Sequence, residues 1–523
     1  MKIKKYMLCF GMVMMLAGMT ACGNVPEQEA GAERETEETV VVTEMSEEQE
    51  TDTEQAVIDT SRPIERDDST QIEIKSGSIV GGYVDDEKKV ASWRGIPYAK
   101  APVGELRWKA PVEPDAWDGI LECTEWGNSA QQLEQQPFGV YTQEFIIEDT
   151  GYSEDCLNLN VWSDLSDDTE KPVLVYIHGG GFTTGGSSCE IYDGSYLAEQ
   201  GIVVVSINYR LGIYGFFANS ELVEESDENT AGNYAILDQI EALKWVNENI
   251  EQFGGDKNNV TIMGQSAGAS AVNALIVSPK AAGLFEHAVS MSFNDYCLPR
   301  ETDQWRTLED TVAKNDEACE GYSLEQLRAM SNEELMSLKT ASSRPCIDGV
   351  VLSESFADAI DSGKANMVDL MTGGVTGDVS LFGFSDEKTE KLSGVDIMSG
   401  SYQLLAQSYS EYNDNVYVYY DSHPLPGSTS AMHTSEVPYF MHVFSEIRQD
   451  DWTAEDIALG DEMSGYLINF CKYGNPNGTE LPEWEKYDGT YSYMNFDAKA
   501  QMTKMDEDVI IGLQEIFSET KTE

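Results

Sequence analysis

The chain has 523 residues, of which 41% are hydrophobic and 10% aromatic, enough apolar side chain for a large packed interior. Its 93 acidic residues outnumber its 33 basic residues and give a formal net charge of −60 at pH 7. Such a charge repels phosphate backbones and anionic bilayers at long range, so nucleic acid is not expected as a partner.

The first 22 residues have the pattern of an export signal. Lysines at positions 2, 4 and 5 precede an apolar run over residues 6–17, and Met19-Thr20-Ala21-Cys22 follows. This pattern resembles a bacterial lipobox, in which Cys22 becomes lipidated and forms the new N-terminus. The alternative is an ordinary signal peptide cleaved elsewhere, or an uncleaved anchor. In each case the rest of the chain is exported. On the lipobox interpretation we expect a lipoprotein of the cell envelope that touches the membrane only through its lipid.

Residues 23–70 are rich in Glu, Thr, Ser and Gln and contain almost no large apolar side chain. Such a segment buries too little surface to offset the entropy lost on folding. We predict an acidic, disordered tether over residues 23–70, with a reach on the order of 40 Å as a flexible coil. The folded domain is predicted to occupy residues 71–523.

Short β-rich runs alternate with helical runs beyond residue 70, which predicts an α/β fold with a mostly parallel sheet flanked by helices. The clearest strands are short and rich in β-branched or aromatic residues; they cover residues 173–177, 203–207, 260–263 and 416–420. Between the second and third of these strands, apolar residues from Ile236 to Phe253 recur every three or four positions, and Gly254-Gly255 follows. This spacing predicts an amphipathic crossover helix.

A glycine loop, His178-Gly179-Gly180-Gly181-Phe182, follows the strand that ends at Ile177. Consecutive glycines allow backbone N–H groups to point into a cavity, where they can stabilise the oxyanion that forms when an ester carbonyl is attacked. Glycine loops after strands also bind phosphate, but no Lys-Ser or Lys-Thr follows this one. The loop therefore favours acyl-transfer chemistry.

The pentapeptide Gly264-Gln265-Ser266-Ala267-Gly268 occurs once and has the Gly-x-Ser-x-Gly pattern of a nucleophile elbow. The pattern alone is weak, because a glycine-rich chain of this length produces it by chance with appreciable frequency. Its context is stronger: a predicted strand runs into it, and a helix-compatible run over residues 269–277 leaves it. We therefore predict Ser266 as the nucleophile.

A serine nucleophile needs a base, and the chain has five histidines. The chain order of this architecture, Ser then acid then His, removes His178 as well as His287, which lies in an apolar run only 21 residues after Ser266. His423 precedes a proline, and His442 lies in an apolar segment that suits packed structure. His433 lies in a loop of small residues. The sequence motifs alone therefore leave His423, His433 and His442 open as candidates.

The acid of the triad should lie near a strand end between the nucleophile and the histidine. Asp378 has this position, because it follows the strand-like residues 368–372 and Gly373-Gly374. Many other Asp and Glu residues lie in the same interval, and most such side chains are solvated surface charges. Spacing alone therefore leaves several acids open.

Beyond these motifs, the chain resembles the type-B carboxylesterase/lipase family, which includes para-nitrobenzyl-esterase-like enzymes and the cholinesterases, over roughly residues 72–515. The matching segments are 95–99, 102–107, 154–161, 208–212, 253–256, 260–268 and 474–478. The resemblance implies an α/β-hydrolase fold. It implies a triad of Ser266, Asp378 and His433, and an oxyanion hole formed by the N–H groups of Gly180, Gly181 and Ala267. No Cys-x-x-Cys spacing occurs, so no metal is expected, and acyl transfer by such a triad needs no cofactor.

Two departures from the family pattern carry expectations of their own. Gln265 stands where many relatives have Glu, which removes a negative charge beside the nucleophile and disfavours cationic, choline-like substrates. Cys156 matches one half of an early family disulfide, but Ala130 stands where its partner is expected. Cys123 is the nearest substitute, so a Cys123–Cys156 bond is a hypothesis.

The sequence thus predicts a serine carboxylesterase that hydrolyses small-molecule esters through an acyl-enzyme. A feruloyl, acetyl or xenobiotic esterase and a lipase all fit these motifs. The alternative from another class is a non-catalytic adhesion or ligand-binding lipoprotein of the cell surface on the same fold. The complete triad favours the enzyme.

Overall fold

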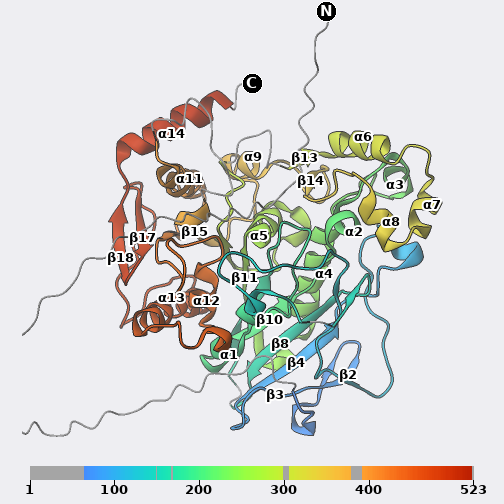
Figure 1. Cartoon of the computed structure of the whole chain (residues 1–523), viewed down its shortest axis with the longest axis horizontal. Coiled ribbons are helices and arrows are strands. Elements are labelled where there is room, and N and C mark those ends of the chain that lie inside the picture. Colours follow the sequence, from blue (N-terminus) through green and yellow to red (C-terminus); the bar gives the residue numbers. More distant parts are fainter. Residues whose placement is uncertain (1–63, 149, 167–168, 298–304, 379–391, 521–523) are drawn as a thin grey trace, which may run out of the picture. The chain divides into compact units, whose positions relative to one another are not determined.

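The computed structural model describes residues 64–520 except 149, 167–168, 298–304 and 379–391 (Figure 1). These residues belong to a compact unit, Ala56–Glu523. The predicted signal peptide, the lipidation site Cys22 and residues 23–63 of the predicted tether lie outside the described residues. No helix within the described ranges is long and apolar enough to cross a bilayer.

An 11-stranded sheet forms the centre of the described domain. In spatial order its strands are β18 (Ala500–Lys504), β17 (Ser492–Phe496), β16 (Val416–Asp421), β15 (Asp369–Val375), β12 (His287–Met291), β11 (Gly255–Gln265), β9 (Lys171–Ile177), β10 (Val203–Ile207), β8 (Asn158–Asp164), β4 (Val90–Pro97) and β3 (Gly82–Tyr83). The strands from β10 to β17 pair in parallel, and the pairs toward both edges are antiparallel. The predicted strands are confirmed within this mostly parallel sheet.

Helices cover both faces of the sheet, as a parallel sheet requires. Their bounds are α1 (Ser195–Glu199), α2 (Gly212–Phe216), α3 (Ser220–Glu225), α4 (Tyr234–Asn249), α5 (Ala267–Val277), α6 (Leu308–Ala318), α7 (Leu324–Ala329), α8 (Asn332–Ser337), α9 (Phe356–Asp361), α11 (Gly394–Tyr409), α12 (Glu436–Met441), α13 (Ala454–Tyr473) and α14 (Glu507–Thr520). The predicted crossover helix is α4, which continues as a 3-10 turn and ends at Gly254 in the left-handed region.

Alternate residues of the central strand β9 enter two separate apolar cores. Val173 and Val175 pack in one core with side chains of α4 and α5, whereas Leu174 and Tyr176 pack in the other with side chains of α1 and α13. This alternation follows from the two-residue period of a strand. The two cores fix the layered arrangement of the predicted α/β-hydrolase fold, which is confirmed.

Short strands form three further sheets: β1 (Ile72–Ile74) with β2 (Gly77–Val80) and β5 (Ile120–Glu122), β6 (Ser129–Ala130) with β7 (Tyr152–Ser153), and β13 (Arg306–Thr307) with β14 (Cys346–Ile347). The domain also begins earlier than predicted. Ile64 is buried, Asp67 caps a 3-10 turn, and the buried hydroxyl of Thr70 accepts the N–H of Gly81. The prediction that the tether extends to residue 70 is therefore wrong for residues 64–70, whose contacts hold them on the domain.

The structure contradicts the predicted Cys123–Cys156 disulfide. The cysteines of the described residues are all free and buried. The thiol of Cys123 lies 3.9 Å from the carbonyl oxygen of Leu121, whereas Cys156 faces the buried charges of Asp238 and Arg210. Burial raises the pKa of Cys123 to about 12 and raises that of Cys156 as well. The two thiols have different surroundings and pack as small apolar side chains.

Candidate active site

The predicted nucleophile lies on a sharp strand-to-helix turn. Strand β11 ends at Gln265, α5 begins at Ala267, and Ser266 between them has φ 58° and ψ −124°. A non-glycine residue with this backbone is strained, and the surrounding structure must hold it. The N–H of Ser266 donates to the carbonyl oxygen of Met291 at the end of β12. The side chain of Ser266 is half-buried, so it remains reachable from solvent.

Both glycines of the pentapeptide are required by close backbone approach. A Cβ on Gly264 would lie 2.3 Å from the carbonyl oxygen of Gly268 across the turn. A Cβ on Gly268 would lie 2.1 Å from the carbonyl oxygen of Ile177 in β9. The elbow is therefore packed directly against the strand that carries the glycine loop.

His433 and Asp378 form the hydrogen-bonded pair that the triad requires. Nδ1 of His433 lies 2.6 Å from Oδ1 of Asp378, and the second carboxylate oxygen accepts the N–H of Val375 at 3.0 Å. Asp378 is fully buried in a 3-10 turn, Thr376–Asp378, at the end of β15. The N–H of Gly377 donates to the carbonyl oxygen of Ala431, which joins this turn to the loop of His433.

The other histidines show why a carboxylate partner alone does not identify the base. His287 pairs with Asp369 at 3.0 Å, His423 with Asp456 at 2.9 Å and His442 with Asp461 at 2.8 Å. Burial lowers the pKa of His178, which is stacked on Tyr209, to about 4. The second ring nitrogen of His433 faces the elbow: its Nε2 lies 3.3 Å from the side-chain nitrogen of Gln265, next to the nucleophile.

The loop that carries two of the predicted oxyanion donors packs against the elbow, since a Cβ on Gly179 would lie 3.2 Å from Cβ of Ser266. Gly180 and Gly181 have φ values of 104° and 63°, and the carbonyl oxygen of Gly180 accepts the N–H groups of Thr183 and Thr184. These bonds turn the loop back on itself directly after β9. Ala267 is the first residue of α5, where backbone N–H groups have no partner within the helix. Gly180 and Gly181 are not buried, and their N–H groups engage no carbonyl of the described residues.

Comparisons with known proteins identify the family of this chain. The model of the carboxylesterase family matches residues 68–401 and 386–510. The chain belongs to the carboxylesterase family. It is 30% identical to the fumonisin B1 esterase of Sphingopyxis macrogoltabida, with 81% of this chain and 86% of that protein covered. It is 32% identical to the para-nitrobenzyl esterase of Bacillus subtilis, with 77% and 90% covered.

A solved structure extends the agreement to three dimensions. A carboxylesterase of Geobacillus stearothermophilus, crystallised at pH 6.2, superposes with a TM-score of 0.70 at 30% identity. The match covers 85% of this chain and 99% of the other. The protein is therefore a carboxylic ester hydrolase with the α/β-hydrolase fold, and the family implies a small-molecule ester as substrate.

The sequence reasoning missed one buried acid of this carboxylesterase site. Glu436, three residues after His433, is fully buried, and its Oε1 accepts a hydrogen bond from the hydroxyl of Ser292. Burial raises the pKa of Glu436 to about 8, and the charge of Asp378 adds to this effect. Ser292 follows β12 with φ 54°, and its N–H donates to the carbonyl oxygen of Gly373. Glu436 resembled one of many surface acids in sequence, so only its burial distinguishes it.

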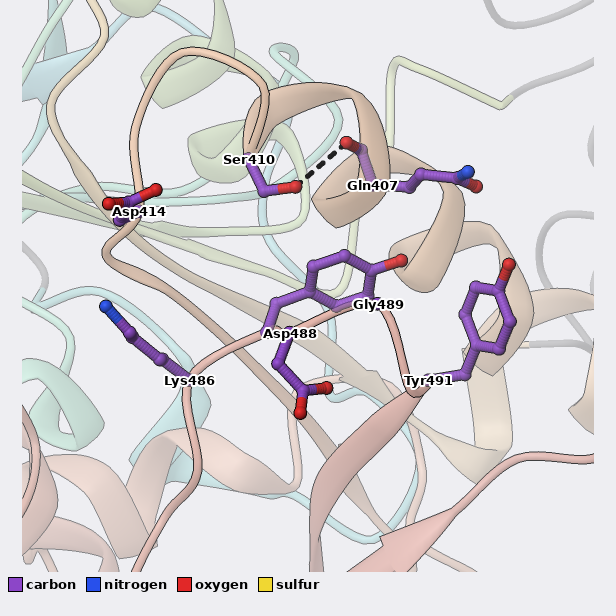
Figure 2. Close-up of a pocket in the computed structure, with 8 residues that line it drawn as sticks. Gln407, Ser410, Asp414, Lys486, Asp488, Gly489 and Tyr491 are labelled. Atoms are coloured by element: carbon purple, nitrogen blue, oxygen red, sulfur yellow. Dashed lines mark hydrogen bonds between the residues drawn. The ribbon is translucent and has the colours of Figure 1, made fainter.

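A separate cavity of 440 Å³ has no predicted site residue in its lining. Figure 2 shows the residues that line it. It is lined by the end of α11 and by the segment that precedes β17, including Ser410, Asp414, Lys486 and Tyr491. In this segment the N–H of Tyr487 donates to the carbonyl oxygen of the first residue of β16. The cavity therefore lies at the amino end of that strand, whereas the elbow lies at the carboxyl end of β11. No His, Cys, Asp and Glu cluster of metal-binding form occurs within the described ranges.

Proposed function

We propose that the enzyme hydrolyses carboxylic esters through a serine acyl-enzyme, with Ser266 as nucleophile, His433 as base and Asp378 as its orienting acid. The observation that carries this proposal is the 2.6 Å hydrogen bond between Nδ1 of His433 and Asp378. The other ring nitrogen, Nε2, is directed toward the elbow. A carboxylate only accepts hydrogen bonds, so this contact fixes the proton of the neutral ring on Nδ1. Nε2 then has the lone pair that general-base catalysis needs.

The two half-reactions follow from this arrangement. His433 takes the hydroxyl proton of Ser266 as the oxygen attacks the ester carbonyl, and the carbonyl oxygen becomes an oxyanion. Collapse of this intermediate expels the alcohol, which receives the proton from the imidazolium. Water then attacks the acyl-enzyme with the same base, and the carboxylic acid leaves while Ser266 recovers its proton.

The oxyanion is stabilised by the N–H groups of Gly180, Gly181 and Ala267. The support is that the loop after β9 packs against the elbow at Gly179 and that Ala267 opens α5. Donors of this kind stabilise the charge that develops in the transition state more than the substrate itself. The loss of one preorganised donor of this type costs about 10²–10³ in rate.

The substrate that we propose is an ester without a cationic alcohol group. The residue before the nucleophile, Gln265, is neutral and buried, so it supplies no charge for a quaternary ammonium group. Two similar proteins are named for para-nitrobenzyl esters and for fumonisin B1. These names suggest that the family scaffold accepts bulky esters, which sets the range of a first substrate panel.

We also propose that the enzyme is exported and lipid-anchored through Cys22. The support is the sequence pattern of residues 1–22, and the tether would hold the catalytic domain away from the membrane. Metabolic labelling with a fatty acid should tag the protein, and Cys22→Ala should lose both the label and the membrane fraction. Equal labelling of the variant would contradict the assignment.

The catalytic proposal is tested by hydrolysis of short p-nitrophenyl esters by the mature domain and by its Ser266→Ala variant. We expect the variant to lose activity by several orders of magnitude, as removal of a triad nucleophile does. Ser410→Ala is the matched control, because Ser410 lines the separate cavity and should leave the rate unchanged. Equal rates for enzyme and Ser266→Ala, or no hydrolysis by either over a range of acyl lengths, would favour the non-catalytic binding protein.

A further inference from the structure

The side chain of Gln265 contacts the catalytic base directly. Its Nε2 lies 3.3 Å from Nε2 of His433, and the side chain is only 1% exposed. The sheet fixes its position, because Gln265 ends β11 in parallel register with Met291 of β12. Gly179 leaves the space beside it, since a Cβ there would lie 2.7 Å from the backbone oxygen and 3.3 Å from Oε1 of Gln265.

The direction of this hydrogen bond follows from the opposite side of the ring. Nδ1 of His433 donates to Asp378, so Nε2 of the neutral ring accepts. The side-chain nitrogen of Gln265 has two N–H donors and no lone pair to offer. The amide therefore donates to the same lone pair that takes the proton of Ser266 during catalysis.

The imidazole of His433 lies near acidic side chains, so the neutral side chain of Gln265 differs in charge from these neighbours. Asp378 faces the ring from the turn after β15, and Glu436 lies behind that carboxylate on α12. Burial raises the pKa of Glu436 to about 8 and raises that of Asp421, at the end of β16, well above its usual range. Glu144 and Arg448 lie 3.8 Å apart, and both act electrostatically on Tyr141, whose hydroxyl donates to the carbonyl oxygen of Thr434 in the loop of His433. The carboxylate in direct contact with the ring is therefore that of Asp378.

We propose that Gln265 is a positioning residue whose amide N–H holds the imidazole of His433 in its neutral, proton-accepting form between turnovers. This inference deepens the proposed serine-esterase mechanism and rests on it. A donor on Nε2 stabilises the neutral ring, whereas a protonated ring would place two N–H groups against each other. When the ring takes the proton of Ser266, a half-turn of the amide presents Oε1, which accepts the new N–H.

A carboxylate at position 265 has the opposite effect. Gln265→Glu keeps the shape of the side chain, but it only accepts hydrogen bonds and adds a negative charge 3.3 Å from the ring nitrogen. Both changes favour the imidazolium, which cannot act as a base. Gln265→Met has a similar volume and removes the donor without adding a charge, so its effect should be intermediate.

The test is the pH profile of kcat/KM from pH 5 to 9 for the enzyme, Gln265→Glu and Gln265→Met. The substrate is a short p-nitrophenyl ester, and the product is followed at a wavelength where its absorbance does not depend on pH. We expect the midpoint of the acid limb to rise by about one pH unit in Gln265→Glu, as for a nearby opposite charge. At one unit below the wild-type midpoint, kcat/KM should then be about tenfold lower than in the enzyme, and the ratio should shrink as pH rises. Gln407→Glu, at the exposed cavity of Figure 2, is the control and should keep the wild-type midpoint.

Three outcomes separate the possibilities. A raised midpoint in Gln265→Glu with a smaller rise in Gln265→Met supports the proposal. Profiles that superimpose, or that fall by one factor at every pH, would show that Gln265 only fills space and would overturn it. If Gln265→Glu does not fold, judged by its melting temperature, the Gln265→Met profile decides by the same criterion. Ser266→Ala is measured in parallel: activity retained there refutes the proposed function itself, whereas an inactive Ser266→Ala with unchanged Gln265 profiles refutes only this inference.

Discussion

Replacement of the buried acid Glu436 by glutamine should change how the stability of the enzyme depends on pH. Burial, with the charge of Asp378 added, raises the pKa of Glu436 from an ordinary 4.5 to about 8. The folded protein therefore holds a proton that the unfolded chain has released over most of this range. The contribution of Glu436 to the free energy of unfolding is greatest below pH 4.5 and falls as pH rises toward 8, because folding must take up that proton.

The size of this effect follows from the shift. One pKa unit corresponds to about 1.4 kcal/mol, so between pH 5 and 8 the ionisation of Glu436 lowers the free energy of unfolding by roughly 3–4 kcal/mol. Glu436→Gln keeps the shape and the hydrogen-bonding capacity but cannot ionise. The free energy of unfolding of the variant should therefore fall less than that of the enzyme between pH 5 and 8. The difference between the two should shift steadily in favour of the variant as pH rises.

Urea unfolding followed by tryptophan fluorescence at pH 5, 6, 7 and 8 measures the difference. The matched control is Glu507→Gln, because Glu507 occupies the first turn of α14 as Glu436 occupies that of α12, but is exposed. The control should follow the enzyme at every pH. Parallel curves for the enzyme and Glu436→Gln would show that the buried carboxyl does not carry the extra proton and would refute the reasoning.

Three further predictions concern the triad, a buried ion pair and the thiols. Asp378→Asn should lower kcat by about 10⁴-fold while the fold is retained, because the ring loses the acceptor that fixes its tautomer; a loss below tenfold would point to another acid. Asp238→Ala should lower the free energy of unfolding by about 3–5 kcal/mol, because the buried partner Arg210, bonded at 2.7 Å, is left uncompensated. An unchanged denaturation midpoint would contradict this. Alkylation of the unfolded protein without a reducing agent should modify Cys123 and Cys156, as measured by mass spectrometry. If these two cysteines are alkylated only after reduction, they form a disulfide and the assignment of free thiols is wrong.

Several features could be predicted from sequence because neighbouring residues determine them. Buried parallel strands are continuous apolar runs, and the strand at Val173 and the crossover helix at Ile236 were predicted from pattern alone. The elbow around Ser266 was predicted because its glycines, strand and helix lie within a few residues of one another. The predicted start of the domain is too late in the chain. Polar residues such as Asp67 are held on the domain by backbone hydrogen bonds, which composition does not reveal.

The sequence by itself determined the candidate groups for the chemistry: a serine in the pattern of a nucleophile elbow, a glycine loop after the strand that ends at Ile177, and a short list of histidines and acids. Tertiary structure decided which members of that list meet. His433 and Asp378 are 55 residues apart, and His433 and Gln265 are 168 apart, so their contacts depend on the order of strands in the sheet rather than on local pattern. Burial likewise made Glu436 a proton-carrying acid and left Cys123 unpaired, since desolvation and packing exist only once distant segments close around a side chain.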